Sequence, residues 1–435
     1  MLEDHSSGRP LLPRLRTLVV IEIDATKLGA LMLLISPSLR RLRMSFMEGS
    51  FAVESASHSQ PSATDSLLPH VIAAVPDLTD FWIECGLPED LPPRYLSELA
   101  RLERLEKLNI IYSGAVVDHE ALRCISYMTA LRAVELSICL DSIGLSEPLQ
   151  LGEAFLGLED VHLSGSIHDI RRVFEAVQFP KLASLGLSIS TAPTMEVLTD
   201  SLAMVCDRVS RSTTEVHLFI SAEMDSPDIS LSDILQPYLP FREMTSMNIE
   251  FDYHLPGWQD EDMLAFADAW PVLDHFYLAC AADAIRGAPL PLPSQPTVAG
   301  LIELARRCPR LRYVTMPSLD VRTLPSPREV PPVEHQSMQY LEVSRYVGGG
   351  TANLLDLAVI LDVLFPRLKR KRCCVRAKDG VAPDNTDAEH LSVRMTELLL
   401  AALSARRELL DGTPTAEASG GPAGWGESAQ ADQPA

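Results

Sequence analysis

The sequence predicts an α/β solenoid, a curved stack of strand-plus-helix units with parallel strands on its concave face and helices on its convex face. Three observations predict this fold. A short leucine-rich phrase recurs along most of the chain, a proline often precedes it, and a segment with helical spacing follows it. Because one such unit cannot bury its apolar face alone, stacked units share a continuous core.

The recurring phrase is L-x-x-L-x-L, with a large apolar residue at most of the marked positions. Successive copies begin 24–39 residues apart, which overlaps the period of about 20–29 residues of leucine-rich repeats and leaves room for loop insertions. The sequence therefore predicts a leucine-rich-repeat solenoid (horseshoe) of about 12–13 irregular units. Seven clear and five looser copies begin at Leu15, Leu39, Leu78, Leu105, Leu131, Leu158, Leu182, Thr213, Met244, Leu273, Leu311 and Met338.

The spacing of each unit explains its strand and its helix. The last two marked positions are two residues apart, so on a strand their side chains point into the same core. Pro37 and Pro76 come just before the copies at Leu39 and Leu78, where a proline would interrupt a helix. Segments such as 195–209 and 298–308 have helical spacing. An ordinary α/β protein also alternates strands and helices, and it stays the alternative.

The predicted array covers residues 11–375, after a short extension at 1–10. The first repeat begins so early that we expect no ordinary N-terminal capping domain. Residues 376–410 are expected to form a loop and a C-terminal capping helix, because the ends of a solenoid need a cap. Residues 411–435 have the composition of a disordered tail.

Composition excludes several classes of partner. The formal net charge is −22, from 37 basic and 59 acidic residues, so we expect no nucleic acid and no membrane as a partner. The sequence has no signal-peptide pattern, no apolar run long enough for a bilayer and no N-x-S/T acceptor. Its eight cysteines contain no C-x-x-C pair. These features predict a cytoplasmic or nuclear protein in a reducing compartment.

No catalytic motif is present, so we expect neither an enzyme nor a cofactor or metal site. His162 and His168 have only a loose metal-ligand spacing. The glycine-rich segment 348–351 could in principle offer backbone amides to an anion, but we interpret it as a flexible strand-to-helix turn. The basic run from Arg367 to Arg372 is either a nuclear-import signal or the solvated end of a repeat.

The candidate functional residues are those that the strand register points outward on the concave face. Aromatic and imidazole side chains gather there in the C-terminal half, in a chain with 6% aromatic residues. Exposed aromatic residues on a rigid surface are typical anchors for a protein partner, although they could instead only pack against one another. The candidate partner-binding residues are Trp82, His217, Phe219, His275, Tyr277, Tyr313 and Tyr340.

The twelve irregularly spaced units, with phrases such as PRLRYV at 309–314 and FPKLASL at 179–185, resemble the leucine-rich-repeat portion of fungal F-box proteins over about residues 10–370. In that family an N-terminal F-box binds the Skp adaptor of a cullin ubiquitin ligase, and the repeats capture the substrate. The resemblance thus implies a substrate-recognition role, with Skp and cullin as possible partners. The F-box motif itself is not found, because the segment PLLP at 10–13 already belongs to the first repeat.

Two classes of function follow. The chain is either the substrate-recognition module of an F-box type ubiquitin-ligase receptor or a free-standing leucine-rich-repeat binding or inhibitor protein. Both hold a protein partner on the concave face. Co-purification of a Skp adaptor would distinguish the first class from the second.

Overall fold

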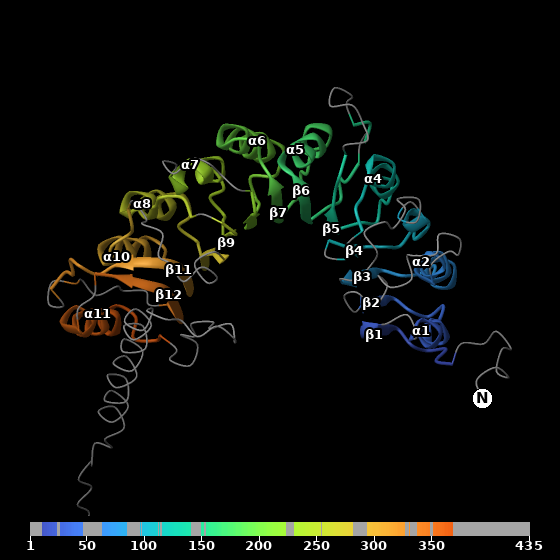
Figure 1. Ribbon diagram of the computed structural model, residues 1–435, viewed down its shortest axis with the longest axis horizontal. Coiled ribbons are helices and arrows are strands. Elements are labelled where there is room, and N and C mark those ends of the chain that lie inside the picture. The colour runs from blue at the N-terminus through green and yellow to red at the C-terminus, as the bar shows by residue number, and fades with distance from the viewer. Residues whose placement is uncertain are drawn as a thin grey trace, which may run out of the picture.

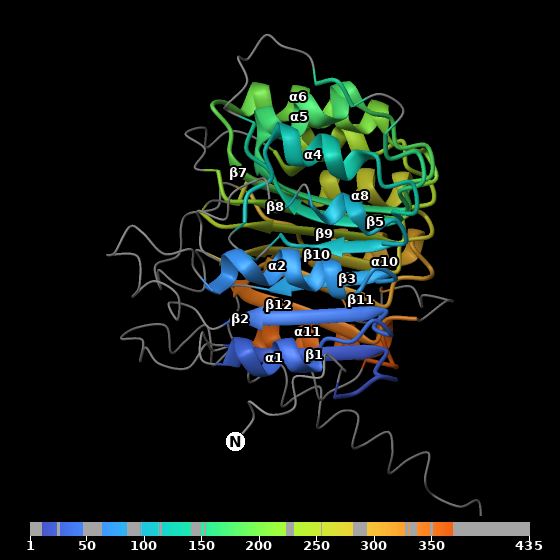
Figure 2. The same ribbon diagram turned by 90° about the vertical axis from the view of Figure 1, so that its right-hand side faces the viewer.

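The computed structural model describes residues 11–368, except for 24–26, 47–62, 85–95, 97, 112, 114, 141–148, 152–153, 223–229, 254, 282–293, 327–329, 331–336 and 349–350. The chain forms an arc with strands along its inner side and helices along its outer side (Figure 1). Viewed from the side, the strands lie one above another as a stack (Figure 2). This arrangement is the predicted leucine-rich-repeat solenoid.

A single parallel sheet lines the inner side of the arc. Its twelve strands follow one another in chain order from β1 to β12, as expected when each repeat packs only on its neighbours. The strands are β1 (Thr17–Ile23), β2 (Arg41–Phe46), β3 (Asp80–Glu84), β4 (Lys107–Asn109), β5 (Ala133–Ser137), β6 (Asp160–Ser166), β7 (Ser184–Thr191), β8 (Glu215–Ile220), β9 (Ser246–Phe251), β10 (His275–Cys280), β11 (Tyr313–Asp320) and β12 (Tyr340–Val347).

Helices and 3-10 turns connect the strands over the convex side. They are α1 (Leu28–Leu34), α2 (Ala63–Ala74), η3 (Glu98–Arg101), α4 (His119–Ser126), α5 (Ile167–Ala176), α6 (Met195–Arg208), α7 (Leu231–Leu235), η4 (Gln236–Tyr238), α8 (Asp260–Ala269), α10 (Val298–Arg307) and α11 (Thr351–Leu364). The helical segments expected at 195–209 and 298–308 correspond to α6 and α10, each ending one residue earlier. The expected capping helix and tail lie outside the described residues.

The apolar positions of the phrase form the core. Leu42 on β2 is paired in register with Phe81 on β3, and Val161 on β6 with Leu185 on β7. Each of these four side chains is at most 1% exposed. Neighbouring strands in a sheet are about 4.8 Å apart, so equivalent side chains stack into continuous apolar rows. Truncating one such side chain to alanine typically costs about 2–5 kcal/mol.

Short polar residues cap the N-termini of several of the helices that follow the strands. Ser166, the last residue of β6, caps α5 by accepting a hydrogen bond from the backbone N–H of Asp169. Thr194 does the same for α6, and Ser230 forms a capping box with Asp233 at α7. Such caps satisfy amides that the first turn of a helix leaves unpaired. They fix the point where each strand turns onto the convex side.

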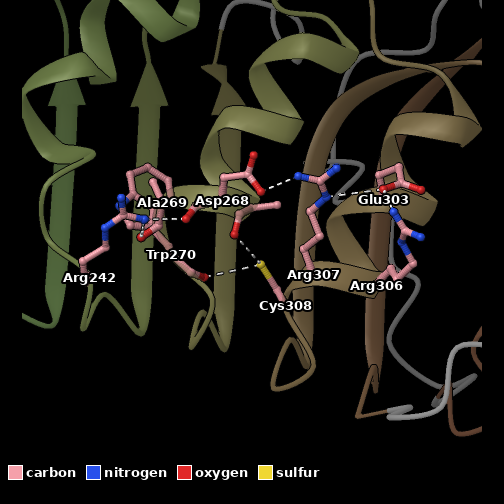
Figure 3. Close-up of polar contacts among 9 residues, drawn as sticks. Arg242, Asp268, Ala269, Trp270, Glu303, Arg306, Arg307 and Cys308 are labelled. Carbon is pink, nitrogen blue, oxygen red and sulfur yellow. Dashed lines mark hydrogen bonds and ion pairs between the residues drawn. The ribbon is translucent and has the colours of Figure 1, made fainter.

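Side chains from neighbouring repeats close the C-terminal end of α8 (Figure 3). From the preceding repeat, the Arg242 Nη1 donates to the carbonyl of Asp268 at 2.5 Å. From the following repeat, the Cys308 thiol donates to the carbonyl of Trp270 at 3.4 Å. The guanidinium of Arg307 forms an ion pair with the Asp268 carboxylate. Because these contacts join three consecutive repeats, they stiffen the part of the arc that carries β9, β10 and β11.

Candidate protein-binding face

The outward side chains of the strands form two rows along the concave face, because the strand register pairs equivalent positions. We call them the first row and the second row. From β2 to β12, the first row consists of Arg41, Asp80, Lys107, Ala133, Asp160, Ser184, Glu215, Ser246, His275, Tyr313 and Tyr340. The second row consists of Arg43, Trp82, Asn109, Glu135, His162, Gly186, His217, Asn248, Tyr277, Thr315 and Glu342.

An aromatic stack occupies the C-terminal end of the first row. The rings of His275 and Tyr313 are stacked with centroids 4.2 Å apart and planes 11° apart. Tyr313 and Tyr340 follow at 6.3 Å with planes 41° apart. The Tyr340 hydroxyl donates to the Glu342 carboxylate at 2.5 Å. In the second row, Tyr277 is the most exposed of the candidate tyrosines, at 36%. These contacts hold several rings in fixed orientations on one surface.

Charged groups hold the imidazole of this stack. The Nδ1 of His275 lies 2.8 Å from the Asp274 carboxylate, which also pairs with Arg312 at 3.1 Å. Asp274 thereby bridges His275 on β10 and the residue that precedes β11. The ring of His275 is therefore held from its edge while its face packs on Tyr313.

Trp82 lies apart from the other candidates, on β3 in the N-terminal half. The guanidinium of Arg43 lies 4.0 Å from the centroid of the Trp82 ring, within the range of a cation–π interaction. Arg43 also forms an ion pair with Glu84. An arginine of the chain itself thus covers this aromatic ring and neutralises the adjacent carboxylate.

His217 and Phe219 lie on β8, between the two ends. The Nδ1 of His217 accepts a hydrogen bond from the Asn248 amide at 2.8 Å, since only the amide nitrogen of that pair has protons to donate in every tautomer. Phe219 pairs in register with Ser188 and with Glu250, which places it one position beyond the second row. The structure therefore separates the candidates into Trp82, the β8 pair, and the four residues of β10–β12.

The centre of the face contains a second imidazole that is largely buried. The Nε2 of His162 lies 2.9 Å from the Ser188 hydroxyl. Burial, and to a lesser degree the nearby His217, lowers the pKa of His162 to about 4. Gly186 makes room for the ring, since a Cβ at that position would lie 2.6 Å from the His162 Cγ. His162 therefore stays neutral near pH 7.

Two carboxylates beside His162 were not among the predicted site residues. Burial, followed by repulsion from Asp160, raises the pKa of Glu135. Burial also raises the pKa of Asp160, with a further contribution from Glu215, against the lowering effects of Ser184, His217 and Lys107. The register already placed Glu135 and Asp160 outward on adjacent strands. Two outward carboxylates on adjacent strands were the signal that the sequence offered for this pair.

The described residues also bear on metal, thiol and membrane sites. No group of three or more His, Cys, Asp or Glu side chains in the described part of the chain is arranged to hold a metal ion. Burial raises the pKa of the Cys308 thiol to about 12, so this thiol is protonated and unreactive at neutral pH. Among the described helices, none combines the length and apolar character that crossing a bilayer requires.

Comparisons with known proteins found matches among solved structures alone. No protein-family model matches the sequence, and none of the curated proteins matches it. The chain is similar to one in the crystal structure of the Rad7 and Elc1 complex in yeast, with 13% identity and a TM-score of 0.40 over 84% of this chain and 85% of that chain. It is also similar to the leucine-rich repeat-containing protein LegL7 from Legionella pneumophila, with 9% identity and a TM-score of 0.36 over 79% and 97%. A third match is the plant peptide hormone receptor RGFR1 in complex with RGF2, with 12% identity and a TM-score of 0.28 over 77% and 57%.

Proposed function

We propose that this chain is a protein-interaction scaffold that holds a partner on its concave face, mainly over β8–β12. The observation that carries the proposal is the aromatic stack of His275, Tyr313 and Tyr340, together with the 36% exposed Tyr277. The proposed partner-contacting residues are His217, Phe219, His275, Tyr277, Tyr313 and Tyr340, whereas Trp82, the seventh predicted residue, lies apart from them on β3 with Arg43 over its ring.

The energetics of association favour such a surface. Large aromatic side chains provide contact area, and few of their torsions must be fixed on binding. Here the rings of His275 and Tyr313 are already held by stacking, and a 2.8 Å contact with the Asp274 carboxylate holds the imidazole edge. The strands beneath them belong to one continuous sheet. A partner would therefore meet a surface that needs little reordering.

Within this class, we propose that the chain acts as the substrate-recognition module of an F-box type ubiquitin-ligase receptor. The support is the resemblance of the repeat units to those of fungal F-box proteins. The second candidate is a free-standing leucine-rich-repeat binding or inhibitor protein. The aromatic stack supports it equally, since holding a partner on the concave face requires no ligase component.

Affinity capture from a native lysate, followed by mass spectrometry, tests both levels of the proposal. The bait is the full chain, compared with a Y277A/Y313A/Y340A variant. A matched control replaces three exposed apolar side chains elsewhere, Tyr127, Tyr253 and Leu355, which are 71%, 38% and 48% exposed. We expect a partner that the wild type and the control retain and that the aromatic variant loses.

The identity of the captured proteins then separates the two candidates. Skp and cullin among the retained proteins would support the ligase receptor, whereas a single unrelated partner would support the free-standing binder. Equal recovery of every partner by the aromatic variant, with an unchanged melting temperature, would contradict a binding role for the aromatic stack.

A further inference from the structure

The two ends of the concave face differ in whether a cation of the chain contacts their aromatic rings and carboxylates, and this difference indicates the chemistry of the partner. At the N-terminal end, one arginine of the chain contacts both kinds of group. Arg43 lies 4.0 Å from the centroid of the Trp82 ring and pairs with the Glu84 carboxylate. The protein thus shows how a guanidinium fits between an aromatic ring and a carboxylate on this sheet.

From β5 to β12 the same kinds of group occur without such a cation. The first and second rows contain no Lys or Arg on these eight strands. They contain the carboxylates Glu135, Asp160, Glu215 and Glu342, alongside His275 and the tyrosines. Among the described residues, none of these four carboxylates forms an ion pair. The nearest in-chain cation that influences Asp160 is Lys107, two strands away.

Two of these carboxylates interact with Asp160. Asp160 lies in the first row of β6 and Glu135 in the second row of the adjacent strand β5, and Glu215 lies two strands further along the first row. Burial raises the pKa of both Glu135 and Asp160. Repulsion from Asp160 adds to the rise at Glu135, against a lowering contact with Asn109, and repulsion from Glu215 adds to the rise at Asp160, against the lowering effects of Ser184, His217 and Lys107. Like charges held together in a partly dry site favour the approach of a cation, which removes both the repulsion and part of the desolvation penalty.

A buried amide beside Glu135 is not fully hydrogen-bonded. Asn109 is 6% exposed and is paired in register with Glu135. Its side chain interacts with the Glu135 carboxylate and lowers the pKa of that group, but its Nδ2 lies outside hydrogen-bond geometry to any partner among the described residues. An unsatisfied buried donor calls for an acceptor, which a peptide carbonyl supplies once Glu135 turns toward a bound cation. A polyamine or a bare metal ion has no such acceptor.

We infer that the concave face takes an extended, basic protein segment whose Lys or Arg lies among Glu135, Asp160 and Glu215 while its apolar side chains reach the aromatic stack. This inference rests on the proposed scaffold function and names the chemistry of its partner. From β6 to β10 there are four strand spacings, or about 19 Å at about 4.8 Å each. An extended segment covers that distance with about six residues at about 3.3 Å per residue.

Selection from a displayed library of random dodecapeptides against the full chain tests the inference. We expect the selected peptides to carry Arg or Lys about six residues from a large apolar residue. The tightest peptide is then labelled and titrated by fluorescence anisotropy against three proteins: the wild type, E135Q/D160N/E215Q, and a control with the same change in charge outside the concave rows, D200N/E243Q/D356N. Neutralising the three concave carboxylates should weaken binding at least about tenfold, and the control should bind like the wild type.

A change in the peptide keeps the test valid even if the acidic variant folds poorly. Replacing the selected arginine by citrulline removes the charge while keeping the shape, and should cause a loss of similar size on the wild-type protein. Peptides without a basic residue, or equal binding of the citrulline peptide, would overturn the inference. Displacement by spermine at the peptide's own Kd would assign the site to polyamines and would also overturn it.

Two outcomes distinguish this inference from the proposed function. Binding that is lost in Y277A/Y313A/Y340A but kept in E135Q/D160N/E215Q would support the scaffold and contradict the basic partner. If the library yields no binding peptide, the basic-segment inference fails, and the capture experiment judges the scaffold function by itself.

Discussion

The N-terminal and C-terminal halves of the concave face contain the same kinds of side chain in opposite states. On β2 and β3, Arg43 covers the Trp82 ring and pairs with Glu84, so one guanidinium of the chain contacts both an aromatic ring and a carboxylate. On β10–β12 the rings of His275, Tyr313 and Tyr340 contact one another instead, and no Lys or Arg stands in the two rows. The comparison teaches that exposure alone does not mark a binding surface, because a cation of the chain covers the ring at one end of the face, whereas the rings at the other end meet no such cation within the two rows.

The largest expected effect comes from the core beneath the aromatic stack. Phe276 is 2% exposed, with its ring 6.4 Å from that of Trp258 and 6.1 Å from that of Phe266. F276A should cost about 3–5 kcal/mol, through lost burial and the cavity it leaves. Hydrogen exchange should show the loss in β9–β11 and leave β2–β4 protected, since each repeat contacts only its neighbours.

The control for this prediction is the next residue, Tyr277, which points to the opposite face of the same strand. Y277A should change the free energy of unfolding by less than about 1 kcal/mol, as for most exposed positions. A loss at Tyr277 as large as at Phe276 would mean that the aromatic stack is part of the core, and the contrast between the two halves would then fail.

The second prediction concerns acid stability at the centre of the face. The folded-state pKa of His162 is about 4, lowered by burial and by His217, whereas an unfolded histidine titrates near about 6.5. Between these values the unfolded chain binds more protons than the folded one, so stability falls as pH falls from about 6.5 to about 4 and levels off below. This single group should account for a loss of about 2–3 kcal/mol.

H162Q removes that titration while keeping a polar group near Ser188. Urea unfolding of both proteins between pH 7 and pH 4 should show the wild type losing stability relative to H162Q by that amount. The raised pKa values of Glu135 and Asp160 act with the opposite sign in both proteins, so they cancel in the difference to a first approximation. Parallel pH curves would show that His162 is free to become protonated in the folded state.

The third prediction concerns Gly186, whose lack of a side chain leaves room for the His162 ring. A Cβ there would lie 2.6 Å from the His162 Cγ and 2.9 Å from its Cδ2, so G186A should displace the ring and weaken its contact with Ser188. Overpacking of this kind typically costs about 1–3 kcal/mol. The double variant G186A/H162A should be more stable than the sum of the two single losses predicts, because the second change removes the clash. Strict additivity in thermal unfolding would contradict the contact.

The sequence was sufficient to predict the repeat, the register and the outward residues, because a period of two on each strand decides which side chains enter the core. It predicted that His275, Tyr313 and Tyr340 share one surface, since they occupy the same position in three successive phrases. It could not show that Arg43 covers Trp82, which depends on the rotamers of two long side chains. It also could not show that the pKa values of Glu135 and Asp160 are raised, because the rise comes from burial and from side chains on neighbouring strands.

The smallest effect tests the N-terminal half directly. R43M removes the cation over Trp82 and leaves Glu84 without its ion pair. It should cost about 0.5–1 kcal/mol in urea unfolding, because both groups are partly exposed to water. R41M, two residues earlier on the same strand, is the matched control, since Arg41 makes one exposed hydrogen bond to the Thr17 hydroxyl at 3.2 Å.

The effect of R43M on peptide binding is more informative than its effect on stability. In R43M no guanidinium of the chain contacts Trp82 and Glu84, so the variant should gain a second, weaker site for the selected arginine peptide. Calorimetry should then show more than one peptide bound per protein. If R43M and R41M each bind one peptide with unchanged affinity, the contacts of Arg43 with Trp82 and Glu84 do not explain the difference between the two halves.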